Sequence, residues 1–296
     1  MDGRRANAND RVDRNVCVHS ILAGSVDAAD LPFKAPPPPP PVFSWTGFYA
    51  GLNVGGGIGV SSTAQNATFN STVLGINGLL AGGTNSLAMT GWLLGAQAGF
   101  NWQVAPSIVL GIEGDWQWTS QQGSTVNSTP PAALAFFGAG ANGFGYSLAT
   151  QQKLTEIATA RARGGVVVQN SLWYVTGGAA WGTIKDSYGF SGSANPVIFP
   201  AALQPGPFLN SAASFSASKW GWTVGAGVET RLGGGWSAKL EYLYVDLGHI
   251  TETVPIAINP AFGPAFINGG SASTTSTYHV TDNIMRAVVN YRFFNY

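Results

Sequence analysis

Apolar and polar residues alternate along residues 219–232. The even positions from Trp220 to Val228 are apolar, whereas the odd positions are small, polar or charged. A period of two indicates an extended strand with one apolar face. Two tryptophans at one end and charges on the polar face are typical of a strand that crosses a membrane, with aromatic rings near the headgroups and polar groups facing an enclosed lumen.

The same alternation recurs in seven further segments. They are residues 45–60, 91–102, 107–118, 154–169, 172–184 and 236–247, and the segment that follows Val280.

The connections between these eight segments alternate in length. Short turns are expected at Pro106, Asn170 and Gly234. Long loops are expected at residues 61–90, 119–153, 185–218 and 248–280, centred on Asn77, Phe137, Pro200 and Phe262. Short periplasmic turns and long outer loops are typical of outer-membrane barrels. The sequence therefore predicts an all-β fold, a transmembrane eight-stranded antiparallel up-and-down β-barrel with both termini in the periplasm.

Tryptophans and charges support this assignment of the two faces. All ten tryptophans fall in or beside a predicted strand, as interfacial aromatic girdles require. Charged strand residues on the polar phase are predicted to face the lumen, because an Arg or Lys facing lipid at the midplane would cost about 2 to 4 kcal/mol. They are Glu113, Asp115, Arg161, Arg163, Lys219, Glu229, Arg231, Lys239, Glu241, Arg286 and Arg292.

Eight strands enclose a space that side chains alone can fill. The four acids and seven bases of this set are therefore expected to pair across strands as a structural charge network. Such a packed network would prevent free solute flow.

The composition argues against several other classes of protein. Only 9% of residues are charged, and Lys+Arg and Asp+Glu balance at 14 each, which argues against nucleic-acid binding. The sequence contains no run of 18 or more apolar residues, so no transmembrane helix is predicted. We predict no cofactor, metal or catalytic site. An enzyme acting on lipid A stays an alternative, with His249, Glu252, His279 and Asp282 converging near a loop serine, although their spacing singles out no triad.

The first 44 residues differ from the rest. Residues 1–28 carry arginines, then a short apolar segment that contains Cys17, then small residues, and this order is typical of a secretory signal peptide. Residues 29–44 include six consecutive prolines at 36–41, which predict a stiff polyproline II spacer in the periplasm. The barrel is expected over residues 45–296.

Five short motifs resemble the alpha-proteobacterial outer-membrane immunogenic and porin-like family, small relatives of the OmpA-type barrel. They are Ala-Asp-Leu-Pro at 29–32, Trp-Thr-Gly-Phe-Tyr-Ala-Gly-Leu-Asn-Val-Gly at 45–55, Tyr-Val-Thr-Gly-Gly-Ala-Ala-Trp-Gly at 174–182, Glu-Tyr-Leu-Tyr at 241–244 and Asn-Tyr-Arg-Phe at 290–293.

The resemblance implies an eight-stranded barrel in the outer membrane of a Gram-negative bacterium, inserted by the barrel-assembly machinery and often antigenic. The chain departs from the family pattern at residues 294–296, which extend past the usual terminal aromatic residue.

The sequence favours a structural, non-enzymatic barrel whose partners are outer-membrane lipid and lipopolysaccharide. Three alternatives stay open. They are a narrow porin for small solutes, a surface binding protein, for example for haem, and the lipid A enzyme. Oligomeric state is not predicted.

Overall fold

The computed structural model describes residues 43–71, 76–129, 144–194, 209–258 and 270–293. The expected signal segment at 1–28, nearly all of the spacer at 29–44 and the last three residues lie outside this range. None of the described residues form a helix long and apolar enough to cross a membrane.

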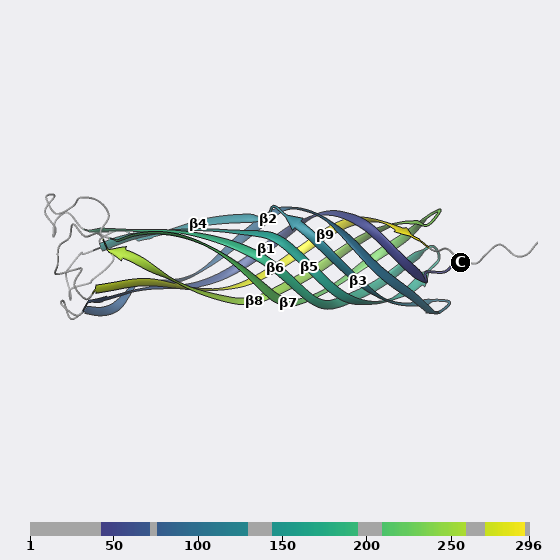
Figure 1. Ribbon diagram of the computed structural model, residues 1–296, viewed down its shortest axis with the longest axis horizontal. Coiled ribbons are helices and arrows are strands. Elements are labelled where there is room, and N and C mark those ends of the chain that lie inside the picture. The colour runs from purple at the N-terminus through teal and green to yellow at the C-terminus, as the bar shows by residue number, and fades with distance from the viewer. Residues whose placement is uncertain (1–42, 72–75, 130–143, 195–208, 259–269, 294–296) are drawn as a thin grey trace, which may run out of the picture. The chain divides into compact units, whose positions relative to one another are not determined.

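Nine strands build the described part of the chain (Figure 1). They are β1 (Gly47–Ser71), β2 (Ile76–Ala105), β3 (Ile108–Thr119), β4 (Gln122–Thr129), β5 (Phe144–Val168), β6 (Ser171–Ala194), β7 (Leu209–Gly233), β8 (Trp236–Ile258) and β9 (Gly270–Arg292).

The strands close into an antiparallel ring. β1 pairs with β2 on one side and with β9 on the other, so the first and last strands meet. β3 and β4 both pair with β5, through Trp118↔Glu156 and Gln122↔Lys153, and they lie toward opposite ends of the barrel (Figure 1). They therefore occupy one position in the wall, and the ring has the eight positions predicted. The turns expected at Pro106, Asn170 and Gly234 are confirmed.

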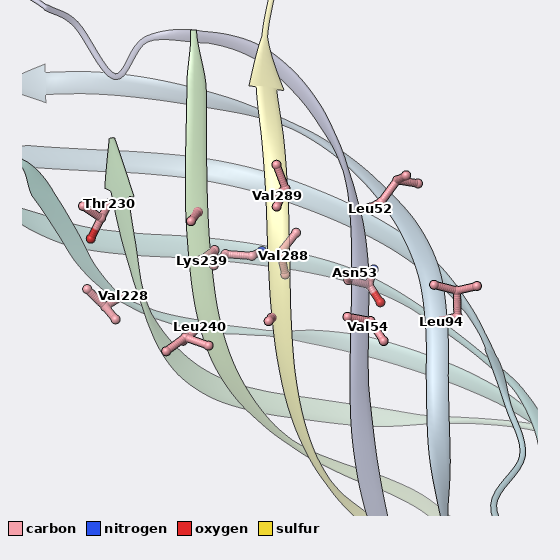
Figure 2. A pocket seen from close by; sticks show the side chains of 12 residues that line it. Leu52, Asn53, Val54, Leu94, Val228, Thr230, Lys239, Leu240, Val288 and Val289 are labelled. Atoms are coloured by element: carbon pink, nitrogen blue, oxygen red, sulfur yellow. The ribbon is translucent and has the colours of Figure 1, made fainter. Parts of the chain in front are cut away.

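The outer face of the ring is apolar, as the alternation predicts. Leu52 is 69% exposed and Val54 56%, whereas Asn53 between them is 2% exposed. Figure 2 shows the same surface over β7, β8, β9, β1 and β2, where Leu94 and Leu240 also line an open depression in the outer wall. The predicted phase of these strands is confirmed.

Eight tryptophans are at least 43% exposed on this outer face: Trp92, Trp102, Trp116, Trp118, Trp173, Trp220, Trp222 and Trp236. Trp181 packs beside Trp116, with ring centroids 5.4 Å apart. The prediction is wrong for Trp45, which is only 2% exposed and packs with Val109, Leu172 and Tyr174 inside the barrel.

The strands extend far into the segments that were predicted to be long loops. β1 ends at Ser71, and Asn77, the expected centre of the first loop, lies in β2. The other three expected centres, Phe137, Pro200 and Phe262, lie outside the described residues. The pattern missed these extensions because their inward positions mix apolar side chains, such as Leu87 and Val254, with polar ones, such as Thr63 and Gln65.

The wall divides into two sheets in these extensions. β2 and β4 share only the pair Thr90↔Gln122, and β7 and β8 share no pair between residues 211–221 and 247–256. One sheet is therefore β4-β5-β6-β7, and the other is β8-β9-β1-β2. We call this part the two-sheet extension.

The two sheets pack face to face through their inner sides. The Tyr278 hydroxyl on β9 donates to Asp186 Oδ2 on β6, and Gln65 Nε2 on β1 donates to Thr150 Oγ1 on β5 at 3.3 Å. Apolar side chains are buried between them, among them Leu87, Leu148, Tyr188, Val254 and Ile256. Residues read as solvated loops thus have a core of their own.

The regular alternation of outward and inward side chains on β7 predicts that substitutions at two adjacent residues affect stability differently. Val224, on the outer face, is 47% exposed. Val224→Arg should destabilise the protein by about 2 to 4 kcal/mol in a reversible bilayer-folding titration, because a guanidinium would face hydrocarbon. Thr223 faces the lumen and donates to the Tyr244 carbonyl at 2.9 Å, a bond that Thr223→Ser retains. Equal losses at the two positions would contradict the assigned faces.

Candidate functional site

Most of the buried charged side chains lie together in the lumen of the ring. Four acids and four bases project into it from five strands, so their formal charges cancel. They are Glu113 and Asp115 on β3, Arg161 and Arg163 on β5, Glu229 on β7, Lys239 and Glu241 on β8, and Arg286 on β9. Each of these side chains is no more than 2% exposed. We call this set the charge network.

Glu113 is the centre of the charge network. Its Oε1 lies 2.8 Å from Lys239 Nζ and 2.5 Å from Arg161 Nη2, and its Oε2 lies 3.4 Å from Arg163 Nη1. The Tyr49 hydroxyl also donates to Oε2 at 2.7 Å. One carboxylate therefore joins β3 to β5, β8 and β1.

Asp115 and Glu241 extend the charge network across the ring. Asp115 Oδ2 lies 2.8 Å from Arg161 Nη2 and 3.0 Å from Arg286 Nη2. Arg286 Nε donates to Glu241 Oε2 at 2.7 Å, and Tyr174 donates its hydroxyl to Glu241 Oε1 at 2.7 Å. Buried charges are tolerated when they are paired and hydrogen-bonded. The pairing is complete here, whereas Arg161 Nε and Arg286 Nη1 have no hydrogen-bond partner among the described residues.

Glu229 completes the charge network near the turn between β7 and β8. Its Oε2 lies 2.7 Å from Arg163 Nη2. Ser237 Oγ and Asn290 Nδ2 donate to its Oε1 at 2.6 and 3.1 Å. Tyr49 and Glu229 thus hold the two ends of one guanidinium, since Arg163 Nη1 also donates to the Tyr49 hydroxyl at 3.0 Å.

Three of the bases predicted to pair in the lumen lie apart from the charge network. Among the described residues, no carboxylate lies within ion-pair distance of Lys219, Arg231 or Arg292. Arg231 and Arg292 instead stack on the Phe43 ring, 3.9 and 5.0 Å from its centroid, and Arg292 Nη1 donates to the Ser44 carbonyl at 2.9 Å. The sequence showed an excess of three bases over acids, but it did not show that two of them close the barrel's end against the segment before β1.

An apolar layer fills the lumen on the other side of the charge network, and this layer was not predicted from the sequence. Leu243 lies two residues after Glu241 on β8, and Ile284 lies two residues before Arg286 on β9. Both are fully buried. The layer continues into the base of the two-sheet extension through Ile250 and Tyr278. It is made of Met89, Leu93, Leu154, Ile157, Ala180, Ile184, Leu243, Val245, Leu247, Ile250, Tyr278, Val280 and Ile284. Its signal was present as apolar residues on the inward phase of β8 and β9.

The four residues of the enzyme alternative do not converge. His249 and His279 stack on the outer face, with ring centroids 4.5 Å apart, and His279 Nε2 lies 2.9 Å from Asp246 Oδ1. Asp282 turns inward, where it is 1% exposed and accepts from Gln121 Nε2 at 2.8 Å. The wall thus separates the imidazoles from that carboxyl. Within the described ranges, no three or more His, Cys, Asp or Glu side chains are placed to hold a metal ion.

One titratable cluster lies between the sheets of the two-sheet extension, outside the ring. Burial raises the pKa of Asp186 to about 6, although the Tyr278 hydroxyl donates to this carboxyl and opposes the shift. Burial also raises the pKa of Tyr188 and of Tyr278 above the ordinary range of a phenol. These groups tie β6 to β9.

A closed antiparallel ring with an apolar outer face, aromatic girdles and a charged interior defines a transmembrane β-barrel. The family model described as outer membrane protein beta-barrel domain matches residues 35–293. The chain therefore belongs to the outer-membrane β-barrel protein family, which places it in the outer membrane of a Gram-negative bacterium.

Two relatives have immunogenic outer-membrane names. The 31 kDa outer-membrane immunogenic protein of Brucella melitensis biotype 1 is 34% identical over 239 residues, which cover 78% of this chain and 85% of that protein. The 25 kDa outer-membrane immunogenic protein of Brucella ovis is 28% identical over 231 residues, covering 77% of this chain and 82% of that one. These names agree with the family that the motifs resemble.

Solved barrels are similar at a lower level. The outer-membrane protease OmpT of Escherichia coli is 10% identical with a TM-score of 0.39, covering 85% of this chain and 98% of that one. OprG of Pseudomonas aeruginosa is 10% identical with a TM-score of 0.37, covering 84% and 97%. At these values neither structure bears on function.

The charge network predicts which luminal charges support the fold. Glu241→Ala should destabilise the barrel by about 3 to 5 kcal/mol, because Arg286 and Arg161 would keep their charge without this partner. Lys219→Ala should change stability by less than about 0.5 kcal/mol, because this lysine has no ionic partner in the described wall. Bilayer-folding titrations of both variants would test this, and a larger loss in Lys219→Ala would contradict it.

Proposed function

We propose that this protein is a structural, non-enzymatic barrel of the outer membrane whose lumen is closed to free solute flow. The observation that carries the proposal is the filled lumen. Its charge network of four acids and four bases lies between the apolar layer on one side and the Phe43, Trp45 and Arg292 cluster on the other. An eight-strand interior is just wide enough for side chains of this size to fill.

A wide pore would need a different interior. Water-filled barrels have more strands, and their polar side chains line the wall without meeting across it. Here Glu113 on β3 contacts Lys239 on β8, and Arg161 on β5 contacts Glu241 on β8, so side chains bridge the lumen. Moving these groups apart would expose unpaired charges, which makes a transient wide opening costly.

The proposal includes an orientation and partners. The short turns at Pro106, Asn170 and Gly234 and both termini would lie in the periplasm, and the two-sheet extension would project from the cell surface. Short periplasmic turns in bacterial barrels support this orientation. Outer-membrane lipid would contact the apolar face, lipopolysaccharide would surround the base of the extension, and the barrel-assembly machinery would insert the chain.

The closed lumen predicts little conductance. Purified wild-type protein in a planar bilayer should give at most small, flickering currents, because the charge network and the apolar layer block the same path. A charge-balanced Arg161→Ala, Glu241→Ala variant removes two large luminal side chains and should conduct more than wild type. Large, steady currents from the wild type would replace this proposal with the porin alternative.

The orientation predicts which residues face the medium. Cysteine variants Thr253→Cys, in the two-sheet extension, and Ser107→Cys, in the turn between β2 and β3, would be made with Cys17→Ser. A membrane-impermeant maleimide should label Thr253→Cys on intact cells, and Ser107→Cys only after the outer membrane is opened. The reverse order would overturn the orientation without affecting the conductance result.

A further inference from the structure

Two seams run along the two-sheet extension where neighbouring strands do not pair. One separates β2 from β4 beyond the pair Thr90↔Gln122, and the other separates β7 from β8 beyond Trp222↔Asp246. β2 and β4 stay in contact as far as Gly123, whose backbone lies against the Ala88 carbonyl, and they share no pair beyond that point. Packed sheets lie about 10 Å apart, whereas hydrogen-bonded strands lie about 4.8 Å apart, so edges separated by the sheet spacing cannot bond each other directly. Each seam therefore presents two strand edges with unpaired backbone groups.

The seam between β7 and β8 carries the features that protect an edge. Pro255 cannot donate a backbone hydrogen bond, and Lys219 places a charge on the opposite edge. Ser211 Oγ also crosses the seam and donates to the Pro255 carbonyl at 3.0 Å. The strands pair again at Asn210↔Ala257, which closes the far end of this seam.

The seam between β2 and β4 has none of these features in its described residues. Beyond the contact of Gly123 with Ala88, residues 83–87 of β2 read Gly-Thr-Asn-Ser-Leu, and residues 124–129 of β4 read Ser-Thr-Val-Asn-Ser-Thr. Neither stretch contains a charge or a proline. Uncharged, unprotected edges of this kind are templates for pairing with another strand.

Symmetry decides which strand can fill this seam. Copies inserted into one membrane point the same way, so a two-fold axis between them must lie along the membrane normal. Rotation about that axis brings the β4 edge of one copy to the β2 edge of the other on both sides of the axis. β2 and β4 run in opposite directions, since β2-β3 and β4-β5 are both antiparallel and β3 continues into β4. The resulting pairs are antiparallel.

Antiparallel pairing of like edges is excluded by the same argument. An antiparallel β4-to-β4 or β2-to-β2 pair needs a two-fold axis perpendicular to the strands, which would invert one barrel relative to the membrane. Among antiparallel pairs, only the exchange of unlike edges is compatible with two copies inserted in the same sense. It also satisfies both edges of each copy at once.

We propose that a second copy of this chain occupies the seam between β2 and β4, so that β4 of one protomer pairs with β2 of its partner and the reverse. Each sheet of one protomer then continues into a sheet of the other. Main-chain hydrogen bonds supply the affinity of such strand addition, and the uncharged, small side chains at the edges permit close approach. The protein is thus a two-fold dimer held outside the lipid.

The register of the intrachain pair suggests a site for a disulfide test. Counting six residues from each member of Thr90↔Gln122 brings Thr84 opposite Ser128, and both are exposed on the outer side of the extension. Directly opposed residues in antiparallel strands are about 4.5 to 5.5 Å apart at Cα, within the range of a disulfide. Thr84→Cys and Ser128→Cys are therefore the probes.

The two probes would be expressed as separate chains with different tags, each in the full-length chain with Cys17→Ser, and oxidised in the outer membrane. A disulfide-linked heterodimer is expected from the mixture. Neither probe expressed alone should link comparably, because like edges do not meet. Heat-modifiability of each variant on gels would show that its barrel is folded.

The matched control uses Ala64→Cys with Thr84→Cys. Ala64 on β1 is directly opposite Thr84 within one sheet, so this pair should link when both cysteines are in one chain and should not link between separate chains. Absence of the heterodimer from folded probes would overturn the proposal, as would equal linking by either probe alone. So would a Thr84→Cys, Ser128→Cys double variant that links only within one chain, because the seam would then close on itself.

Discussion

The structure depends on the need to pair every backbone N–H and C=O group wherever water is absent. An unpaired group in hydrocarbon costs several kcal/mol, so strands that cross a membrane must close into a ring. This chain pairs every wall position between its aromatic girdles. The two seams begin close to Trp92 on β2 and next to Trp222 on β7, on the side of residues 211–221. Both tryptophans are exposed residues of the girdle, so the ring opens only where water can satisfy the free edges.

Closure with eight positions then determines the interior. A ring of this size has a narrow lumen, so every inward side chain meets a partner from across the barrel. Charges can be kept there only if they balance, and four acids face four bases. Glu113 contacts Arg161, Arg163 and Lys239, and Tyr49 donates to it as well. The charge network and the ring therefore stabilise each other, since each cross-lumen pair fixes two strands.

The ring could be predicted from sequence because lipid imposes a strong contrast between its two faces. Leu52, Asn53 and Val54 show this alternation in the sequence and again in their exposed fractions. The ion pairs were less predictable than the faces. The alternation predicts that Lys219, Arg231 and Arg292 point into the lumen, but not how far along the lumen each side chain lies. Arg231 and Arg292 stack on Phe43 at the end of the barrel, and Arg231 lies two residues beyond Glu229 on β7. Trp45 was misassigned because it lies before β1 begins at Gly47, where the alternation of the strand does not decide which way a side chain points.

The two-sheet extension escaped prediction because its inward positions are partly apolar and partly polar, and on β8 the apolar face changes side. On β8, Leu240 and Tyr242 face outward within the ring, whereas Ile250, Val254 and Ile256 face inward beyond it. Outside the lipid, water covers the outer face, and the apolar side chains are stabilised by burial between the sheets. Gly248, with φ of 72°, adopts the left-handed conformation at an irregularity in the pairing of β8 with β9, and this irregularity shifts the alternation by one residue. The inward turn of the apolar face of β8 and the opening of the seams thus have one cause, the change of solvent at the girdle.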